Sequence, residues 1–286
     1  MVAPHTLRHL DSAGIRLSYR LFGEPTTRDP VLFVHGLSYF SHDWVDFGSR
    51  LCSDRAGCAI DMRGFGDSSR DPGLDYGVPA MADDIGRVLD GLGWPRAVLV
   101  AHSMGGRSAS WFAARQPSRV GALVLLDWSP ENSPVGSRRV ANTVANTPDV
   151  FESVADAMAY FGVDGHSPSG AAARERYEAY LSPVEGGFAL KRSTFFRDQF
   201  RRQLQTGEKA KGVDLWALVG EITVPTLALR AKGSDLFDAA TVPRLLQANP
   251  RIELREIEGG HNLAADNPDA TLAAIRGFID SLEKTA

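Results

Sequence analysis

Cysteine is scarce in this sequence, which has only Cys52 and Cys58 among its 286 residues. Two thiols cannot build the disulfide framework of a small secreted domain, so that class of protein is excluded. We interpret both as small apolar side chains in a reduced compartment. The first twenty residues carry charged side chains at short intervals and contain no unbroken apolar core of a signal peptide. We therefore expect a cytoplasmic location.

Long apolar runs and a strong charge of either sign are missing as well. No stretch approaches the roughly 20 apolar residues of a membrane helix, and the formal net charge is -4 at pH 7. We therefore expect neither a membrane nor a nucleic acid as partner. The sequence contains no nucleotide-binding glycine motif, no CxxC pair and no close metal-ligand spacing. We predict no cofactor and no metal, and a small-molecule substrate as partner. Nothing in the sequence indicates an oligomeric state.

Short apolar runs that alternate with helical patterns make up most of the chain, which is 43% hydrophobic. Strands buried on both faces are almost wholly apolar, whereas an antiparallel strand at the edge of a sheet alternates polar and apolar residues, as the first run, Ile15–Phe22, does. The sequence therefore predicts an α/β fold with a mostly parallel central sheet flanked by helices. The predicted strands are Ile15–Phe22, Val31–Val34, Cys58–Asp61, Ala97–Ala101, Val120–Asp127, Thr226–Arg230 and Ile252–Ile257. The predicted helices are His42–Leu51, Pro79–Leu92, Met104–Gln116, Thr241–Ala248 and Asp269–Leu282.

The alternation stops after Asp127, and residues 129–213 show helical patterns without strands. We interpret this segment as an inserted helical cap, with residues 1–128 and 214–286 forming the core domain. The end of the cap, Lys191–Lys211, is rich in Lys and Arg. A solvated helix face explains such a run, and a binding site for an acidic substrate is the alternative.

The sequence around Ser103 combines an apolar strand with an immediate change to a helical pattern. Ala101 and Gly105 stand two residues before and after the serine, and small side chains at these positions permit a sharp turn that exposes Oγ. This pattern predicts that Ser103 is a nucleophile. We interpret the adjacent His102 as a packed residue.

His261 follows Gly259 and Gly260 in the loop between the last predicted strand and the last predicted helix. A serine hydroxyl needs a base with a pKa near the working pH, and histidine meets that need. Because the carboxyl ends of parallel strands meet at one edge of a sheet, we expect His261 to lie near Ser103. We predict that it is the general base.

An oxyanion-binding loop is predicted where His35 and Gly36 end the strand Val31–Val34. A tetrahedral oxyanion is stabilised by backbone N–H groups that are fixed before the reaction begins. The predicted donors are the N–H groups of Leu37 and Met104.

Four segments of the sequence resemble the α/β-hydrolase superfamily and occur in the same order. Within it, the chain is similar to the esterase, lactonase and carbon–carbon hydrolase branch, in which a cap follows the sixth strand. Epoxide hydrolases and haloalkane dehalogenases share the second segment, but they carry aspartate where this chain has Ser103, which disfavours those activities. The segments are Phe33–Gly36, Asp61–Ser68, His102–Gly106 and Gly260–Asn262.

The acid that would orient His261 has two candidates. Asp235 lies where most members of the superfamily carry the acid, but Ser234 occupies the expected register and Asp235 comes one residue late. Asp127 ends a predicted strand at the carboxyl edge of the sheet, where some members keep the acid. We favour Asp127 and keep Asp235 as the alternative.

The leading functional hypothesis is a serine hydrolase that cleaves a carboxylic ester or lactone of a small, partly apolar substrate through an acyl-enzyme. Cleavage of a carbon–carbon bond in a diketone-like substrate and a non-catalytic ligand-binding protein are the alternatives. Aromatic residues of the cap region are candidates for the pocket wall, namely Trp128, Phe161 and Phe196.

Overall fold

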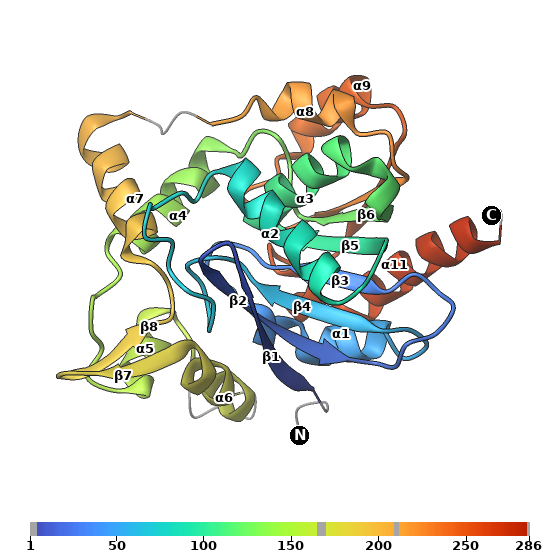
Figure 1. Ribbon diagram of the computed structural model, residues 1–286. Coiled ribbons are helices and arrows are strands. Elements are labelled where there is room, and N and C mark those ends of the chain that lie inside the picture. The colour runs from blue at the N-terminus through green and yellow to red at the C-terminus, as the bar shows by residue number, and fades with distance from the viewer. Residues whose placement is uncertain (1–4, 165–169, 209–211, 285–286) are drawn as a thin grey trace.

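Eight strands form one central sheet in the computed structural model, which describes residues 5–164, 170–208 and 212–284 (Figure 1). The sheet strands are β1 (Thr6–Ser12), β2 (Ile15–Phe22), β3 (Val31–Val34), β4 (Gly57–Asp61), β5 (Ala97–His102), β6 (Val120–Leu126), β9 (Thr226–Ala231) and β10 (Ile252–Ile257). The α-helices around the sheet are α1 (Val45–Leu51), α2 (Val78–Gly91), α3 (Met104–Arg115), α8 (Leu215–Glu221), α9 (Val242–Ala248), α10 (Leu263–Asp266) and α11 (Pro268–Glu283). Short 3-10 helices are η1 (Ser41–Trp44), η2 (Pro117–Arg119) and η3 (Ala239–Thr241).

The strands follow the order β1-β2-β4-β3-β5-β6-β9-β10. β1 pairs antiparallel with β2, and β2 pairs antiparallel with β4, whereas all other neighbours are parallel. The predicted α/β class with a mostly parallel sheet is confirmed. In a parallel sheet the carboxyl ends of the strands share one edge, which here brings the loops after β3, β5, β6, β9 and β10 together.

The first strand was missed, and the prediction that Ile15–Phe22 forms the edge of the sheet is wrong. β1 occupies the edge, and β2 is mostly buried between β1 and β4. Most side chains of β1 are solvent-exposed and none is buried, so no apolar side alternates with a polar one along this strand. Ala13 and Gly14 join the two strands with φ values of 50° and 78°, as a two-residue hairpin turn requires.

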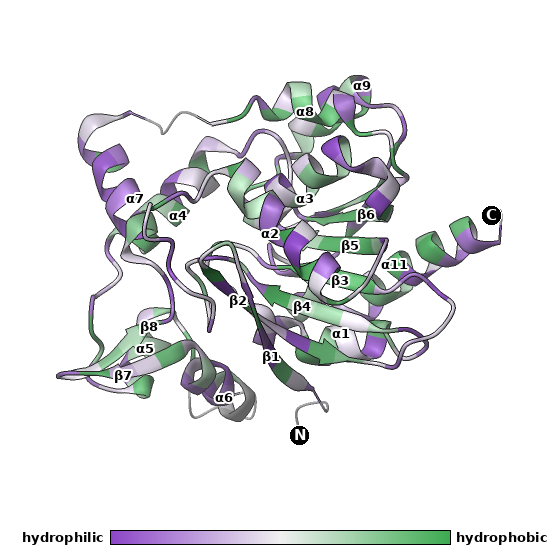
Figure 2. Ribbon diagram, viewed as in Figure 1, coloured by the Kyte–Doolittle hydropathy of each residue, from purple (hydrophilic) through white to green (hydrophobic). Residues whose placement is uncertain are grey.

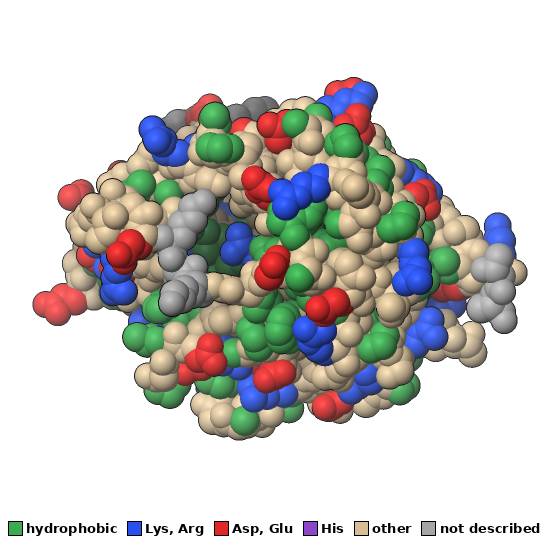
Figure 3. Space-filling view, turned by 90° about the horizontal axis from the view of Figure 1, so that it is seen from above, with side chains coloured by type: hydrophobic (Ala, Val, Ile, Leu, Met, Phe, Trp, Pro, Cys, Tyr) green, Lys and Arg blue, Asp and Glu red, His purple; other side chains and the backbone are tan. Residues whose placement is uncertain are grey.

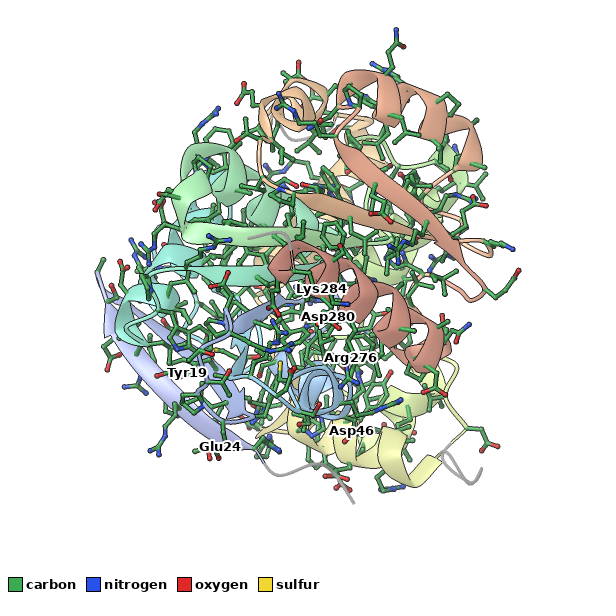
Figure 4. All side chains as sticks on the ribbon, turned by 90° about the vertical axis from the view of Figure 1, so that its right-hand side faces the viewer. Tyr19, Glu24, Asp46, Arg276, Asp280 and Lys284 are labelled. Atoms are coloured by element: carbon green, nitrogen blue, oxygen red, sulfur yellow. The ribbon has the colours of Figure 1, made fainter. Side chains whose placement is uncertain are left out.

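Two apolar cores hold the helices against the sheet. One core packs α2, α3 and α8 against one face, and the other packs α1 and α11 against the opposite face. Hydrophobic residues colour the inner strands in Figure 2, while hydrophilic residues lie on the outer sides of the helices. On the second face α11 runs beside α1 (Figure 4), and Arg276 of α11 donates to Ser53 Oγ at 2.9 Å.

The segment between β6 and α8 contains a hairpin as well as helices, so the prediction of a cap without strands is wrong. The hairpin strands pair over only four residues each, and Glu185 and Gly186 turn between them, Gly186 with a φ of 81°. Strands this short give no recognisable alternation in sequence. The division into core and cap domains stays a prediction. The elements of this segment are α4 (Pro134–Ala145), α5 (Val154–Tyr160), α6 (Gly170–Tyr180), β7 (Leu181–Val184), β8 (Gly187–Leu190) and α7 (Thr194–Thr206).

Ion pairs connect this segment to the sheet domain. Lys191 lies 2.7 Å from Asp67, and Arg176 lies 2.5 Å from Asp43. A backbone bridge also joins Arg192 to Phe65. In the part of the chain that the structure describes, no helix is long and apolar enough to cross a membrane.

Candidate active site

Ser103 stands alone between the end of β5 and the start of α3. Its backbone has φ 51° and ψ -119°, a conformation that non-glycine residues adopt only under strain. A Cβ atom at Gly105 would lie 2.6 Å from the carbonyl oxygen of His35, so only glycine fits there. The small residues on both sides of Ser103 therefore permit the sharp turn that the sequence predicted.

His261 lies beside Ser103 although 158 residues separate them in the sequence. Its Nε2 atom is 2.9 Å from Ser103 Oγ. The loop before it turns at Gly259, whose φ of 146° favours glycine. Strand order explains the approach, because β10 and β5 end at the same edge of the sheet.

Asp127 follows β6 and contacts the other side of the His261 ring. Its Oδ2 atom is 2.6 Å from His261 Nδ1. The same oxygen accepts a hydrogen bond from Ser234 Oγ at 2.5 Å, and Oδ1 accepts one from the Ala231 N–H at 2.9 Å. The side chain is fully buried, and these donors compensate its desolvation. With the ring proton on Nδ1, His261 donates to Asp127 and its Nε2 accepts from the Ser103 hydroxyl.

Asp235, the alternative acid, faces a different partner. Arg139 donates two hydrogen bonds to its carboxylate, at 2.5 Å and 2.8 Å. These bonds lower the pKa of Asp235, whose side chain remains 36% exposed. Ser234, which occupies the register expected for an acid, instead donates to Asp127. The structure thus brings Asp127 to His261 and directs Asp235 to the surface.

The loop predicted to bind an oxyanion packs against Ser103. A Cβ atom at Gly36 would lie 3.1 Å from Ser103 Cβ, so the backbone of this loop approaches the serine closely. Within the described residues, the N–H groups of Leu37 and Met104 donate to no acceptor, and both residues line the same cavity as Ser103. These two donors are therefore available to a bound group.

Two buried histidines fix the backbone around the site, and sequence reasoning assigned neither of them this task. His35 Nδ1 donates to the Gly36 carbonyl at 2.7 Å, and its Nε2 accepts from the Met62 N–H at 3.0 Å. His102 Nε2 donates to the His261 carbonyl at 2.9 Å. Burial lowers the pKa of both rings, so both are neutral. The sequence feature that could have predicted this role is that His35 directly precedes Gly36 and His102 directly precedes Ser103.

A cavity of about 1310 Å³ opens onto Ser103 and His261. Figure 3 shows the surface hollowed, with hydrophobic side chains deep in the hollow. The predicted wall residues Trp128, Phe161 and Phe196 all line this cavity. In residues 5–164, 170–208 and 212–284, no group of three or more His, Cys, Asp or Glu side chains is arranged to hold a metal ion.

The basic run at the end of the predicted cap divides between surface and interior. Arg202 of α7 is exposed, as a solvated helix face requires, and α7 is largely hydrophilic in Figure 2. Arg192 is only 6% exposed and lines the cavity. Lys209 and Lys211 lie outside the described residues.

Comparisons with known proteins agree on one family. A family model described as the alpha/beta hydrolase fold matches residues 29–268. The chain is 28% identical to 2-(acetamidomethylene)succinate hydrolase of Mesorhizobium japonicum over 96% of this chain and 95% of that protein. It is 29% identical to esterase YbfF of Escherichia coli over 88% of this chain and 93% of that protein. A crystal structure of E-2-(acetamidomethylene)succinate hydrolase matches with a TM-score of 0.84 and 28% identity, covering 97% of this chain and all of the other.

The two buried histidines predict how stability depends on pH. Burial lowers the pKa of both rings in the folded protein. As the pH falls below about 6.5, these histidines are therefore protonated in the unfolded chain but stay neutral in the folded protein. We expect the free energy of unfolding to fall between pH 7 and pH 5, by up to about 1.4 kcal/mol per pH unit for each histidine. Urea unfolding at several pH values measures this slope. His102→Gln should make this slope shallower, and equal slopes in the variant and wild type would contradict the account.

Proposed function

Because the chain belongs to the α/β-hydrolase family, we propose that it is a serine hydrolase that cleaves a carboxylic ester or lactone of a small, partly apolar substrate. Membership in this family makes the chain a hydrolase, and the bond and substrate are the proposed part. The observation that carries the proposal is the unbroken chain of hydrogen bonds from Ser103 through His261 to Asp127, with distances of 2.9 Å and 2.6 Å. This arrangement suits acyl transfer from a substrate to a serine hydroxyl.

The proposed reaction begins when Ser103 Oγ attacks the substrate carbonyl while His261 Nε2 accepts the hydroxyl proton. The tetrahedral intermediate collapses when His261 returns that proton to the leaving alkoxide, which leaves an acyl group on Ser103. Water then attacks the acyl carbonyl while His261 Nε2 accepts a proton from it. The bond between the acyl group and Ser103 Oγ breaks, His261 returns the proton to Oγ, and the carboxylic acid departs. For a lactone, the alcohol and the acid leave as one molecule.

The oxyanion of each tetrahedral intermediate needs donors that are already in place. The N–H groups of Leu37 and Met104 are proposed for this task, because both residues line the cavity beside Ser103. Met104 is also the first residue of α3, where the helix dipole favours negative charge. The hydrogen bond from His35 to the Gly36 carbonyl supports the geometry of the Leu37 donor.

Asp127 is the proposed acid of the triad. Its hydrogen bond holds the His261 proton on Nδ1 and leaves Nε2 free to accept from Ser103. The Ala231 N–H and the Ser234 hydroxyl donate to the carboxylate and keep it oriented for this task.

Trp128, Phe161 and Phe196 are proposed to contact the apolar part of the substrate, since all three form part of the cavity wall. The names of the curated relatives support hydrolysis of carboxylic acid derivatives, but they refer to different substrates, a substituted succinate and an unspecified ester. The relatives therefore support the reaction class, and the proposed substrate is argued from the residues that line the cavity.

A substrate panel tests the proposed function. Purified wild type, Ser103→Ala and Ser110→Ala are compared on short acyl esters, lactones and vinylogous diketones. We expect wild type to hydrolyse esters or lactones and Ser103→Ala to lose roughly three orders of magnitude or more in turnover. Ser110 lies on α3 outside the cavity wall, and its buried Oγ has no hydrogen-bond partner among the described residues, so its variant should stay within about twofold of wild type.

Three results would contradict this proposal. Near wild-type turnover by folded Ser103→Ala would remove Ser103 from the mechanism. Cleavage of the diketones alone would replace ester hydrolysis by carbon–carbon bond hydrolysis. Binding of small molecules without turnover of any class would favour a ligand-binding protein.

The two aspartates predict opposite mutational outcomes. Asp127→Asn replaces the acceptor of the His261 Nδ1 proton by an amide, which disfavours the required tautomer, and we expect turnover to fall on the order of a hundredfold or more. Asp235→Asn disturbs only the pair with Arg139, and we expect a loss of less than about threefold because that pair is partly exposed. Steady-state kinetics on a hydrolysed ester measures both. A larger loss for Asp235→Asn than for Asp127→Asn would overturn the assignment.

A further inference from the structure

Four arginine side chains contribute to the wall of the large cavity. Two of them have carboxylate partners. Arg139 pairs with Asp235 at 2.5 Å, and Arg176 pairs with Asp43 at 2.5 Å. The remaining two, Arg107 and Arg192, form no ion pair with any described residue.

Arg107 projects from α3, four residues after Ser103. Its guanidinium makes neither a hydrogen bond nor an ion pair within the described residues, although the side chain is partly buried and lines the cavity. Burial lowers the pKa of Arg107, and no neighbouring carboxylate opposes that effect. An arginine nevertheless stays protonated in a protein, so an uncompensated positive charge faces the cavity.

Arg192 brings a second charge to the same cavity. It is 6% exposed, and among the described residues its guanidinium donates only to two neutral hydroxyl groups, Ser38 Oγ and Thr147 Oγ1, both at 3.2 Å. Five N–H groups are available on a guanidinium, so donors remain for a further acceptor. Ser38 directly follows Leu37, which places Arg192 close to the proposed oxyanion-binding loop.

The carboxylates of the cavity wall do not balance these charges. Asp127 is held by His261, and Glu131 lies 2.8 Å from Arg244. Asp75 is solvent-exposed and accepts a hydrogen bond from the Gly77 N–H. Placing two unpaired cations beside an apolar wall costs free energy, and an anionic ligand would recover it through charge-assisted hydrogen bonds.

We propose that the substrate carries a carboxylate group, which Arg107 binds while the reacting carbonyl lies at Ser103, and that Arg192 adds a second positive charge that attracts this group into the same cavity. This inference rests on the proposed hydrolase function and names its substrate class. Arg107 follows Ser103 by four residues, about 6 Å along the axis of α3, and a short carbon chain between the carboxylate and the reacting carbonyl matches this proximity in the chain. Monoesters or lactones derived from short dicarboxylic acids meet this requirement.

A pair of matched esters tests the charge directly. Monomethyl glutarate carries a carboxylate, and methyl 4-carbamoylbutanoate carries a neutral amide of nearly the same size and shape. We expect wild type to hydrolyse the first with a kcat/KM at least tenfold higher. Arg107→Met should lower kcat/KM for monomethyl glutarate by roughly 10- to 100-fold, because charged hydrogen bonds of this kind are lost. For the amide ester the loss should be several-fold smaller, because a neutral acceptor forms a weaker hydrogen bond with a guanidinium, so the preference for the charged ester falls.

Arg202→Met provides the matched control. Arg202 is exposed on α7 and lies outside the cavity wall, so this variant removes the same charge from the protein without reaching the substrate. We expect its preference for the charged ester to equal that of wild type. An equal loss of preference in Arg202→Met and Arg107→Met would assign the effect to the overall charge and overturn the site.

Arg192 needs two variants because it is buried and bonded to Ser38 and Thr147. Arg192→Lys keeps the positive charge, and Arg192→Met removes it. With a folded protein confirmed by circular dichroism, the methionine variant should lose preference for the charged ester and the lysine variant should keep most of it. If both variants lose activity on the two esters equally, Arg192 supports the loop and does not attract the carboxylate.

A binding measurement separates failure of this inference from failure of the proposed function. Isothermal titration of Ser103→Ala with each ester reports affinity without turnover. Tighter binding of monomethyl glutarate, weakened by Arg107→Met, supports the carboxylate site even if no ester is hydrolysed. Equal affinity for both esters overturns the carboxylate site, while hydrolysis of neutral esters by wild type would leave the hydrolase function intact.

Discussion

The buried carboxylate of Asp127 connects the loops at the carboxyl ends of the sheet strands. Its side chain is fully buried, and an ionised carboxylate in that position is stable only when donors surround it. The donors come from β9, from the loop after β9 and from the loop after β10, through the Ala231 N–H, Ser234 and His261. One side chain at the end of β6 therefore connects three neighbouring strands and orients the histidine at the same time.

The backbone is strained at the ends of β5 and β6. Ser103 and Asp127 both have positive φ values, 51° and 44°, where non-glycine residues are rare. Such conformations cost about 1–3 kcal/mol each and persist only where surrounding contacts impose them. The neutral rings of His35 and His102 provide part of that support, because each holds a backbone carbonyl of a loop beside the serine. Rigid backbone around Ser103 is what a reaction with a developing oxyanion requires.

The sequence was informative where a single local requirement dominates. The inner strands are readable because burial on both faces demands apolar side chains, and the turn at Ser103 is readable because its neighbours must be small. β1 was missed because an exposed edge strand needs no apolar pattern, and β7 and β8 because four residues are too few to show one.

The predicted site residues Ser103 and His261 do meet in the structure. The choice between Asp127 and Asp235 stayed open in sequence because it depends on the path of a loop, which residue types alone do not determine. The unpaired state of Arg107 was equally hidden, since it depends on which carboxylates come near in three dimensions.

The most direct test of the account is whether Ser103 is activated by its two partners. Wild type and His261→Ala are treated with a fluorophosphonate, the labelling rate is followed by intact-protein mass spectrometry, and the modified residue is located by peptide mapping. The account predicts a single adduct on Ser103 in wild type and a labelling rate at least about a hundredfold lower in the variant, because the hydroxyl then lacks its base. Modification of another serine, or labelling of Ser103 at the same rate without His261, would contradict it.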